Sequence, residues 1–209
     1  MAKPHVITLE MAVMSEAKPF ALKMGLEQTG DRPFRVFENE TTALIISGVG
    51  KARAAMAALW AIREWGADEI INMGSAGAND ALSPLGAVFQ INRICESDRM
   101  DLHTRKPVVH IPETFPDLDS ASLSTMDVPA IDAKTRRDIS RMAALSDMEG
   151  AAVAQACRLA GKKCRLFKVV TDTPAHDHED DITQNIKVFR DRLYDFFVEK
   201  VLKRLHQKT

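Results

Sequence analysis

Three acidic residues that follow apolar, strand-like runs are the strongest candidates for chemistry in this sequence. Asp172 ends the run 166–171, and Pro174 then stops the strand. Glu149 lies at a second junction between a strand and a helix, and Glu16 lies early in a helical segment after the first strand. Because ligands bind beyond the carboxyl ends of strands in an open α/β sheet, these acids are candidates for proton transfer or ligand binding. Each could instead cap a loop or complement a helix dipole.

The small residues Gly74-Ser75-Ala76-Gly77 directly follow another buried, strand-like run. Small side chains let the backbone approach a ligand closely, and exposed amides there could bind a sugar or a water. We interpret this segment as a ligand-contacting turn at the same sheet edge. The alternative is a plain tight turn that needs glycine for its backbone angles.

Two other motifs point to no specific chemistry. Gly48-Val49-Gly50-Lys51 lacks the spacing of both common nucleotide-binding loops, so we predict a simple turn between a strand and a helix. The segment 176–181 contains two histidines and three following acids but no third histidine at ligand spacing. We expect a solvated loop that could act as a flap next to Asp172, and no metal site.

Strands and helices alternate along the chain, which predicts an α/β protein with a mainly parallel sheet covered on both faces. The predicted strands are 6–9, 34–37, 43–46, 69–73, 87–94, 143–146 and 164–170. The predicted helices are 12–24, 51–65, 132–142, 150–160 and 185–205, with Asp132 as an N-cap. The Pro-, Asp- and Ser-rich segment 97–130 shows no decisive pattern.

Composition is that of one ordinary soluble domain. The chain has 209 residues, 45% of them hydrophobic, and a formal net charge of -1, so no basic field exists to attract nucleic acid or an anionic membrane. Its three cysteines form no CxxC pair, which argues against a disulfide framework and a structural zinc site. With no visible signal peptide or membrane span, we expect a cytoplasmic protein.

Five segments occur together in a familiar order. In that order the chain resembles the nucleoside phosphorylase/nucleosidase superfamily, and specifically its methylthioadenosine/S-adenosylhomocysteine nucleosidase branch. The resemblance implies one domain over residues 1–209, built as a three-layer α/β/α sandwich around a mixed, mostly parallel and partly barrel-like sheet. It also implies a homodimer, a small-molecule nucleoside substrate and no cofactor. The segments are AVMSE at 12–16, SGVGK at 47–51, INMGSAG at 71–77, DMEGAAVA at 147–154 and VVTD at 169–172.

The resemblance also implies roles in breaking the bond between a purine and its ribose. Asp172 would hand a proton to the purine N7 as the base leaves, and Thr171 would help to hold Asp172. Glu16 would orient and deprotonate the attacking water, near Ser75. As the sugar gains positive charge, carboxylates around it bind more tightly, which lowers the barrier.

Further residues are implied to bind the substrate. Glu149 would accept the ribose hydroxyls, with Met148 packed against the sugar. Ser75 and Gly77 would line the sugar and base, and Val128 belongs to the segment 124–131 that corresponds to the wall of the base pocket. In the nucleosidases that segment carries an aromatic residue that stacks on adenine, whereas here it contains none. The base therefore stays open, with futalosine-like and other purine nucleosides included.

Two alternatives to hydrolysis remain at this point. A phosphorylase would use phosphate in place of water, but phosphorylases of the superfamily carry a glycine-rich loop with an arginine after the first strand. Residues 9–13 contain neither glycine nor arginine, so phosphate would lack its charge partner. The other alternative is a nucleoside-binding protein without activity, which the missing aromatic residue favours.

Overall fold

Continuous apolar runs form the centre of the sheet. In the computed structural model, which describes residues 7–176 and 179–206, four parallel strands lie side by side in the order β4 (Thr42–Ile46), β1 (Ile7–Met11), β5 (Glu69–Ala78) and β10 (Lys163–Asp172). Almost every residue of β1 and β10 is buried, as expected for strands covered on both faces. The carboxyl ends of β1, β5 and β10 therefore meet at one edge.

The sheet curls around this parallel centre and partly closes on itself. Beyond β10 the order continues through β6 (Val88–Met100), β8 (Ser120–Thr125) and β9 (Leu145–Asp147), and β9 pairs back to β5. Since β10 also pairs with β5, these five strands form a closed ring. The other edge is formed by β3 (Arg35–Glu38) and β2 (Glu27–Gly30), while β7 (Pro107–His110) pairs with β6.

The fold class is the predicted one, an α/β protein with a mixed central sheet flanked by helices. The expectation of a mostly parallel sheet holds for the central four strands and for the pairings of β8 with β6 and with β9. Among the described residues, five strand pairings are parallel and five are antiparallel. The antiparallel pairings are those of β6 with β10 and β9 with β5 in the ring, of β7 with β6, and of β3 with β2 and β4 at the other edge.

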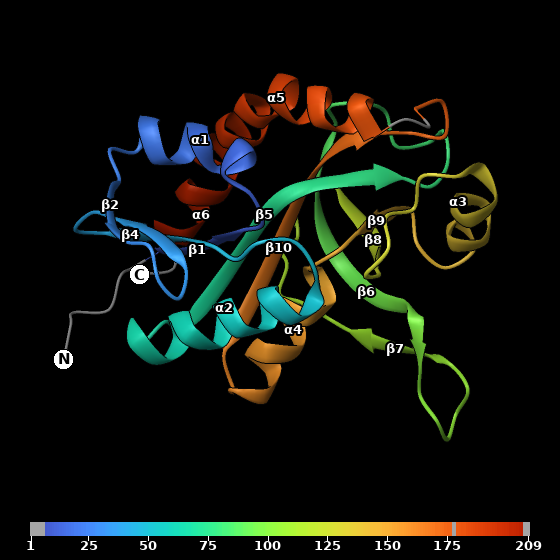
Figure 1. Ribbon diagram of the computed structural model, residues 1–209, viewed down its shortest axis with the longest axis horizontal. Coiled ribbons are helices and arrows are strands. Elements are labelled where there is room, and N and C mark those ends of the chain that lie inside the picture. The colour runs from blue at the N-terminus through green and yellow to red at the C-terminus, as the bar shows by residue number, and fades with distance from the viewer. Residues whose placement is uncertain (1–6, 177–178, 207–209) are drawn as a thin grey trace.

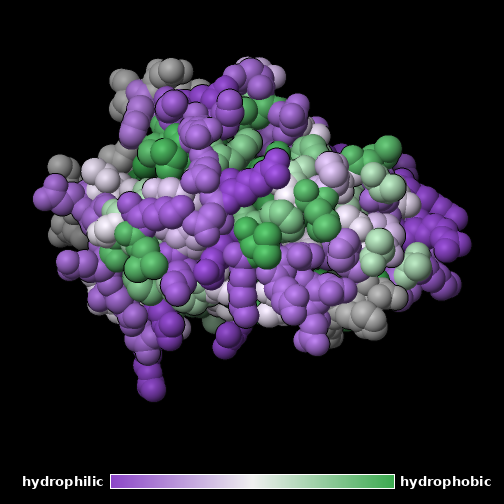
Figure 2. All heavy atoms as spheres, turned by 90° about the horizontal axis from the view of Figure 1, so that it is seen from above, coloured by the Kyte–Doolittle hydropathy of each residue, from purple (hydrophilic) through white to green (hydrophobic). Residues whose placement is uncertain are grey.

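Helices cover both faces of the sheet (Figure 1). On one face lie α1 (Met14–Lys23) and the C-terminal helices α5 (Glu179–Phe196), η1 (Phe197–Leu202) and α6 (Lys203–His206). On the other lie α2 (Lys51–Glu64) and α4 (Gly150–Leu159), while α3 (Ala133–Ser140) stands at the side near β8 and β9. The surface above α1 and α5 is mainly hydrophilic with scattered apolar spots (Figure 2). Within the described residues, none of the helices combines the length and apolarity that a bilayer crossing requires.

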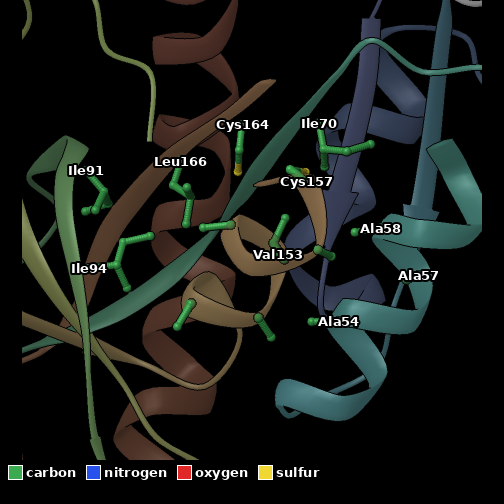
Figure 3. Close-up of a cluster of buried hydrophobic side chains, with 14 of the residues drawn as sticks. Ala54, Ala57, Ala58, Ile70, Ile91, Ile94, Val153, Cys157, Cys164 and Leu166 are labelled. Atoms are coloured by element: carbon green, nitrogen blue, oxygen red, sulfur yellow. The ribbon is translucent and has the colours of Figure 1, made fainter. Parts of the chain in front are cut away.

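A tight core joins α2 and α4 to the sheet (Figure 3). The inward face of α2 consists of four fully buried alanines, whose small side chains bring the helix close to α4 and β5. Val153 and Cys157 of α4 pack there against Ile70 and Leu166. Because α4 begins directly after Glu149, this packing fixes the position of that residue relative to the strand ends.

Several predicted bounds differ from the structure. The Gly74–Gly77 segment, predicted as a turn, continues β5 as far as Ala78, since neither glycine has the positive φ that a tight turn would require. The unassigned segment 97–130 contains the end of β6 together with β7 and β8. The predicted C-terminal helix begins at Glu179 rather than Asn185, so part of the expected loop is helical. Positions 177 and 178 of that loop, and position 6 of the first predicted strand, lie outside the described residues.

Candidate active site

A cavity of about 240 Å³ opens at the carboxyl ends of β1, β5 and β10. It is lined by Glu16, Glu149 and Asp172, which come from three distant parts of the chain. Each of the three is at most 7% exposed. The structure therefore brings together the three acids that the sequence singled out.

Glu16 lies in the first turn of α1 and is anchored to β5. Its Oε1 accepts hydrogen bonds from the Ser75 backbone N–H at 2.7 Å and from Ser75 Oγ at 2.5 Å. Its Oε2 is buried and makes no hydrogen bond to any described residue. A carboxylate held by one oxygen can bind and orient a water through the other. Gly74 permits this placement, because a Cβ there would come within 3.3 Å of Glu16 Oε1.

Glu149 is held from the opposite side by the turn before α2. Its Oε1 accepts the Gly50 N–H at 2.8 Å, and Gly50 has a φ of 100°, which glycine adopts without strain. Burial raises the pKa of Glu149 to about 7, and the charge of Asp147 adds to this effect, while Lys168 and the Gly50 N–H oppose it. Glu149 can therefore change its charge near neutral pH.

A buried ion pair lies behind the acids. Lys168 Nζ lies 2.9 Å from Asp147 Oδ2, and both side chains are at most 2% exposed. Burial lowers the pKa of Lys168, but the charges of Asp147, Glu149 and Glu16 outweigh burial and raise it overall. Asp147 also accepts Thr125 Oγ1 at 2.6 Å and the Gly150 N–H at 2.8 Å. Asp147 thus fixes the turn that presents Met148 and Glu149.

Asp172 is the last residue of β10 and follows a β-bulge in the pairing with β5. Bulges re-aim side chains and occur often beside active sites. Its Oδ1 accepts Thr171 Oγ1 at 3.0 Å, and its Oδ2 is paired with the guanidinium of Arg136. Gly77 lies against this pair, because a Cβ there would meet Asp172 Oδ2 and come within 2.9 Å of Arg136 Nη1.

The wall of the cavity beyond Asp172 is apolar. Pro129, Ala130 and Ile131 form one side, and Ile182 and Ile186 of α5 form another. Val128 was expected in this wall, but its side chain is 66% exposed and lies outside the cavity lining. The wall begins one residue later, where the chain turns inward toward α3.

The charged residues that line the cavity are all acids. Among the described residues that line it, four are Asp or Glu and none is Lys or Arg. The two nearest cations, Lys168 and Arg136, are buried behind the surface and paired with Asp147 and Asp172. Such a cavity stabilises positive charge that develops in a bound ligand and offers no free cation for an anion.

Sequence reasoning found most of this site and missed its cations. Met148, Ser75, Gly77 and Thr171 all line the cavity, as expected. Lys168 was overlooked, although a lysine within an otherwise apolar strand such as 166–170 is a signal of a buried partner. Within the described chain, no group of three His, Cys, Asp or Glu side chains is arranged to hold a metal ion.

Comparison with known proteins agrees with this geometry. The family model of the phosphorylase superfamily matches residues 5–127 and 122–203. A search of curated protein sequences finds no significant match.

Solved structures with similar folds include the methylthioadenosine/S-adenosylhomocysteine nucleosidase of Helicobacter pylori, with a TM-score of 0.84, 15% identity and full coverage of both chains. The methylthioadenosine nucleosidase of Arabidopsis thaliana has a TM-score of 0.78 and 23% identity, covering 97% of this chain and 99% of that one. A futalosine hydrolase mutant of Helicobacter pylori has a TM-score of 0.75 and 15% identity, covering 93% and 99%.

Proposed function

Because the chain belongs to the phosphorylase superfamily, we propose that it hydrolyses the N-glycosidic bond of a purine nucleoside and releases the free base and a ribose derivative. The single observation that carries this proposal is the convergence of Glu16, Glu149 and Asp172 on one cavity. The similar folds of nucleosidases that act on methylthioadenosine, S-adenosylhomocysteine and futalosine support it. We also propose that residues 1–209 act as one domain.

The charges of the cavity suit this reaction. Cleavage of an N-glycosidic bond leaves positive charge on the sugar and negative charge on the departing base. The carboxylates of Glu16 and Glu149 stabilise the developing oxocarbenium ion more than the neutral substrate, which lowers the barrier selectively. Asp172 hands a proton to the purine N7, so the base leaves as a neutral molecule.

The sugar is held between Glu149 and Met148. Glu149 accepts hydrogen bonds from the ribose hydroxyls through the oxygen that Gly50 leaves free, and Met148 packs against the ring. Glu16 Oε2 orients a water, takes its proton and directs it at the anomeric carbon, as in inverting glycosidases. The base lies against the apolar wall at 129–131, with Gly77 giving it room.

Water is favoured over phosphate as the attacking group. A bound phosphate needs arginine, lysine or a set of free backbone N–H groups. No described residue lining the cavity is Arg or Lys, and the Ser75 N–H on the Glu16 side is already donated to a carboxylate. A phosphate beside Glu16 would also meet a like charge.

The proposal is tested by release of free base from a panel of nucleosides with and without phosphate. The panel contains methylthioadenosine, S-adenosylhomocysteine, adenosine, inosine and futalosine. We expect base release from at least one of them, at the same rate in phosphate-free buffer. Tight binding of a nucleoside without release of base from any panel member would show a binding protein instead.

The pKa of Glu149 predicts a pH dependence of catalytic efficiency. Burial raises that pKa to about 7, and only the ionised carboxylate accepts hydrogen bonds from both ribose hydroxyls. We therefore expect kcat/KM to rise as the pH increases through about 7. Glu149→Gln should lower kcat/KM and abolish this rise, because the amide does not titrate. A rise that persists unchanged in Glu149→Gln would assign it to another group.

We also propose that the protein is a homodimer that associates through α2. The inner face of α2 is buried alanine, yet its outer face carries Met56 and Leu59, which are 60% and 46% exposed. Leu159 of the neighbouring α4 is 69% exposed. A helix that is apolar on both sides is normally buried on both sides, and a second copy of the same face would cover it.

The three buried free cysteines suit the reducing cytoplasm, where we propose the enzyme acts.

The dimer proposal predicts a change in molecular mass. Met56→Glu combined with Leu59→Glu places two charges in the interface and should yield monomers by light scattering coupled to size exclusion. Leu22→Glu is the matched control, since Leu22 is 69% exposed on α1 in the opposite helix layer. A wild-type protein that runs as a monomer at micromolar concentration would contradict the proposal.

A further inference from the structure

Arg136 is the largest fully buried side chain in the described structure, and its environment is unusual for its helix. It lies on α3, a short helix whose other positions are mostly polar and exposed, yet its side chain is 1% exposed. A buried guanidinium is retained only where its charge and its N–H groups are satisfied. Its neighbour Arg137 on the same helix is exposed.

The guanidinium of Arg136 connects three segments on the base side of the cavity. Nε donates to the Ile131 carbonyl at 3.2 Å, and Nη1 donates to the Ala78 carbonyl at 2.6 Å. Nη2 is paired with Asp172 Oδ2. These acceptors belong to the apolar wall, the end of β5 and the end of β10. Lysine could not reproduce this arrangement, because only the planar guanidinium offers donors in several fixed directions.

Asp172 has few other constraints. It is the last residue of β10, after a bulge, so its position is not determined by a continuing strand ladder. Thr171 Oγ1 holds its Oδ1, and Arg136 holds its Oδ2. Gly77 leaves room for the pair of Asp172 and Arg136, and a side chain at position 77 would collide with both. Removal of Arg136 would therefore leave one Asp172 oxygen without its partner. It would also remove the hydrogen bond that ties the Ile131 carbonyl of the apolar wall to this pair.

We propose that Arg136 is a positioning residue. It holds the Asp172 carboxyl group and the 129–131 wall in fixed positions relative to each other, around the leaving base. This inference rests on the proposed function for its catalytic consequence. Thr171 on Oδ1 and Arg136 on Oδ2 together fix the direction in which Asp172 presents its carboxyl group to the cavity. No other described cation contacts Asp172.

The test compares three variants by steady-state kinetics on whichever panel nucleoside the wild type cleaves. Arg136→Met fills the same space without charge and should lower kcat about 100-fold, because displaced catalytic groups lose roughly that factor. The effect on KM should be smaller, since the ribose contacts of Glu149 are untouched. Arg136→Lys should be intermediate. Arg137→Met, the matched control one position further on, should leave kcat unchanged.

Wild-type kcat in either Arg136→Met or Arg136→Lys would overturn the proposal. An equal loss in Arg137→Met would overturn it too, because the effect would then belong to the helix as a whole. A crystal structure of Arg136→Lys gives a readout that does not depend on activity or on a foldable methionine variant. We expect Asp172 and residues 129–131 to move from their present positions, and unchanged positions would contradict the assigned role. If the wild type cleaves no nucleoside while this displacement is seen, the proposed function fails and the positioning role stands.

Discussion

Asp172→Asn is expected to lower kcat by about 10²–10⁴-fold, the usual contribution of a positioned general acid. The amide is nearly the same size as the carboxyl group, and its one oxygen can still accept the hydrogen bond from Arg136 while its NH2 group faces the Thr171 hydroxyl, which can accept. It cannot supply the proton that the departing base requires. Activity and folding should therefore separate, with kcat lost while the circular dichroism spectrum is retained.

The control for this variant is Asp180→Asn, which neutralises an exposed acid in the first turn of α5. We expect wild-type kinetics from it. A folded Asp172→Asn protein with full activity would remove Asp172 from the mechanism and leave the base to depart by another route. Base release is followed by chromatography of the free purine.

Glu16→Gln is expected to lower kcat by a factor similar to that of Asp172→Asn, for a different reason. The side-chain oxygen of Gln can still accept the two hydrogen bonds from Ser75, so the side chain stays in place. The oxygen that makes no hydrogen bond to a described residue is replaced by an NH2 group, which cannot accept a proton from water. We expect kcat to fall by about 10²–10⁴-fold with little change in KM.

Ser75→Ala gives the graded control for Glu16. It removes the Oγ donor but keeps the backbone N–H that binds the same carboxylate oxygen. A loss of about 10- to 100-fold is expected, in line with one hydrogen bond to a charged group, worth roughly 1.5–3 kcal/mol. If Ser75→Ala were as inactive as Glu16→Gln, Ser75 would itself contact the reacting atoms. If Glu16→Gln kept wild-type kcat, Glu16 would not be the base.

The positions of two of the three acids follow from a rule of parallel sheets. Glu16 follows β1 and Asp172 ends β10, and the carboxyl ends of β1, β5 and β10 share one edge. Glu149 follows β9, which runs antiparallel to β5, so this rule does not account for its place in the cavity. The strand that carries Asp172 has the apolar composition of a doubly covered strand, so its end could be located from the sequence. The N-cap at Asp132 could also be predicted from the local sequence. Its side chain accepts hydrogen bonds from the Lys134 and Thr135 N–H groups.

Features that depend on contacts between distant segments could not be predicted in this way. Arg136 and Arg137 are adjacent and identical in type, and only the direction of α3 relative to β5 decides which one is buried. The closure of the ring by the pairing of β10 with β5 carries no local signal either. Gly74 and Gly77 suggested a turn, whereas their small size serves to leave room for Glu16 and Asp172 beside an extended strand.

The apolar wall of the cavity shows that single inward-facing residues of a loop are also hard to predict. Within segment 124–131, Pro129, Ala130 and Ile131 line the cavity, whereas Val128 is 66% exposed and lies outside the lining. Periodicity does not apply in a loop, so the inward-facing residues could not be identified. Aliphatic side chains from α5, Ile182 and Ile186, line another side of the same cavity.

The most direct test of the account is the origin of the oxygen on the released sugar. The reaction is run to a single turnover in phosphate-free buffer made with heavy-oxygen water, and the sugar is analysed by mass spectrometry. We predict that the anomeric hydroxyl carries the heavy isotope and that added phosphate changes neither the product nor the rate. A product that forms only when phosphate is present, and that carries a phosphate at the anomeric carbon, would contradict hydrolysis by this cavity of carboxylates.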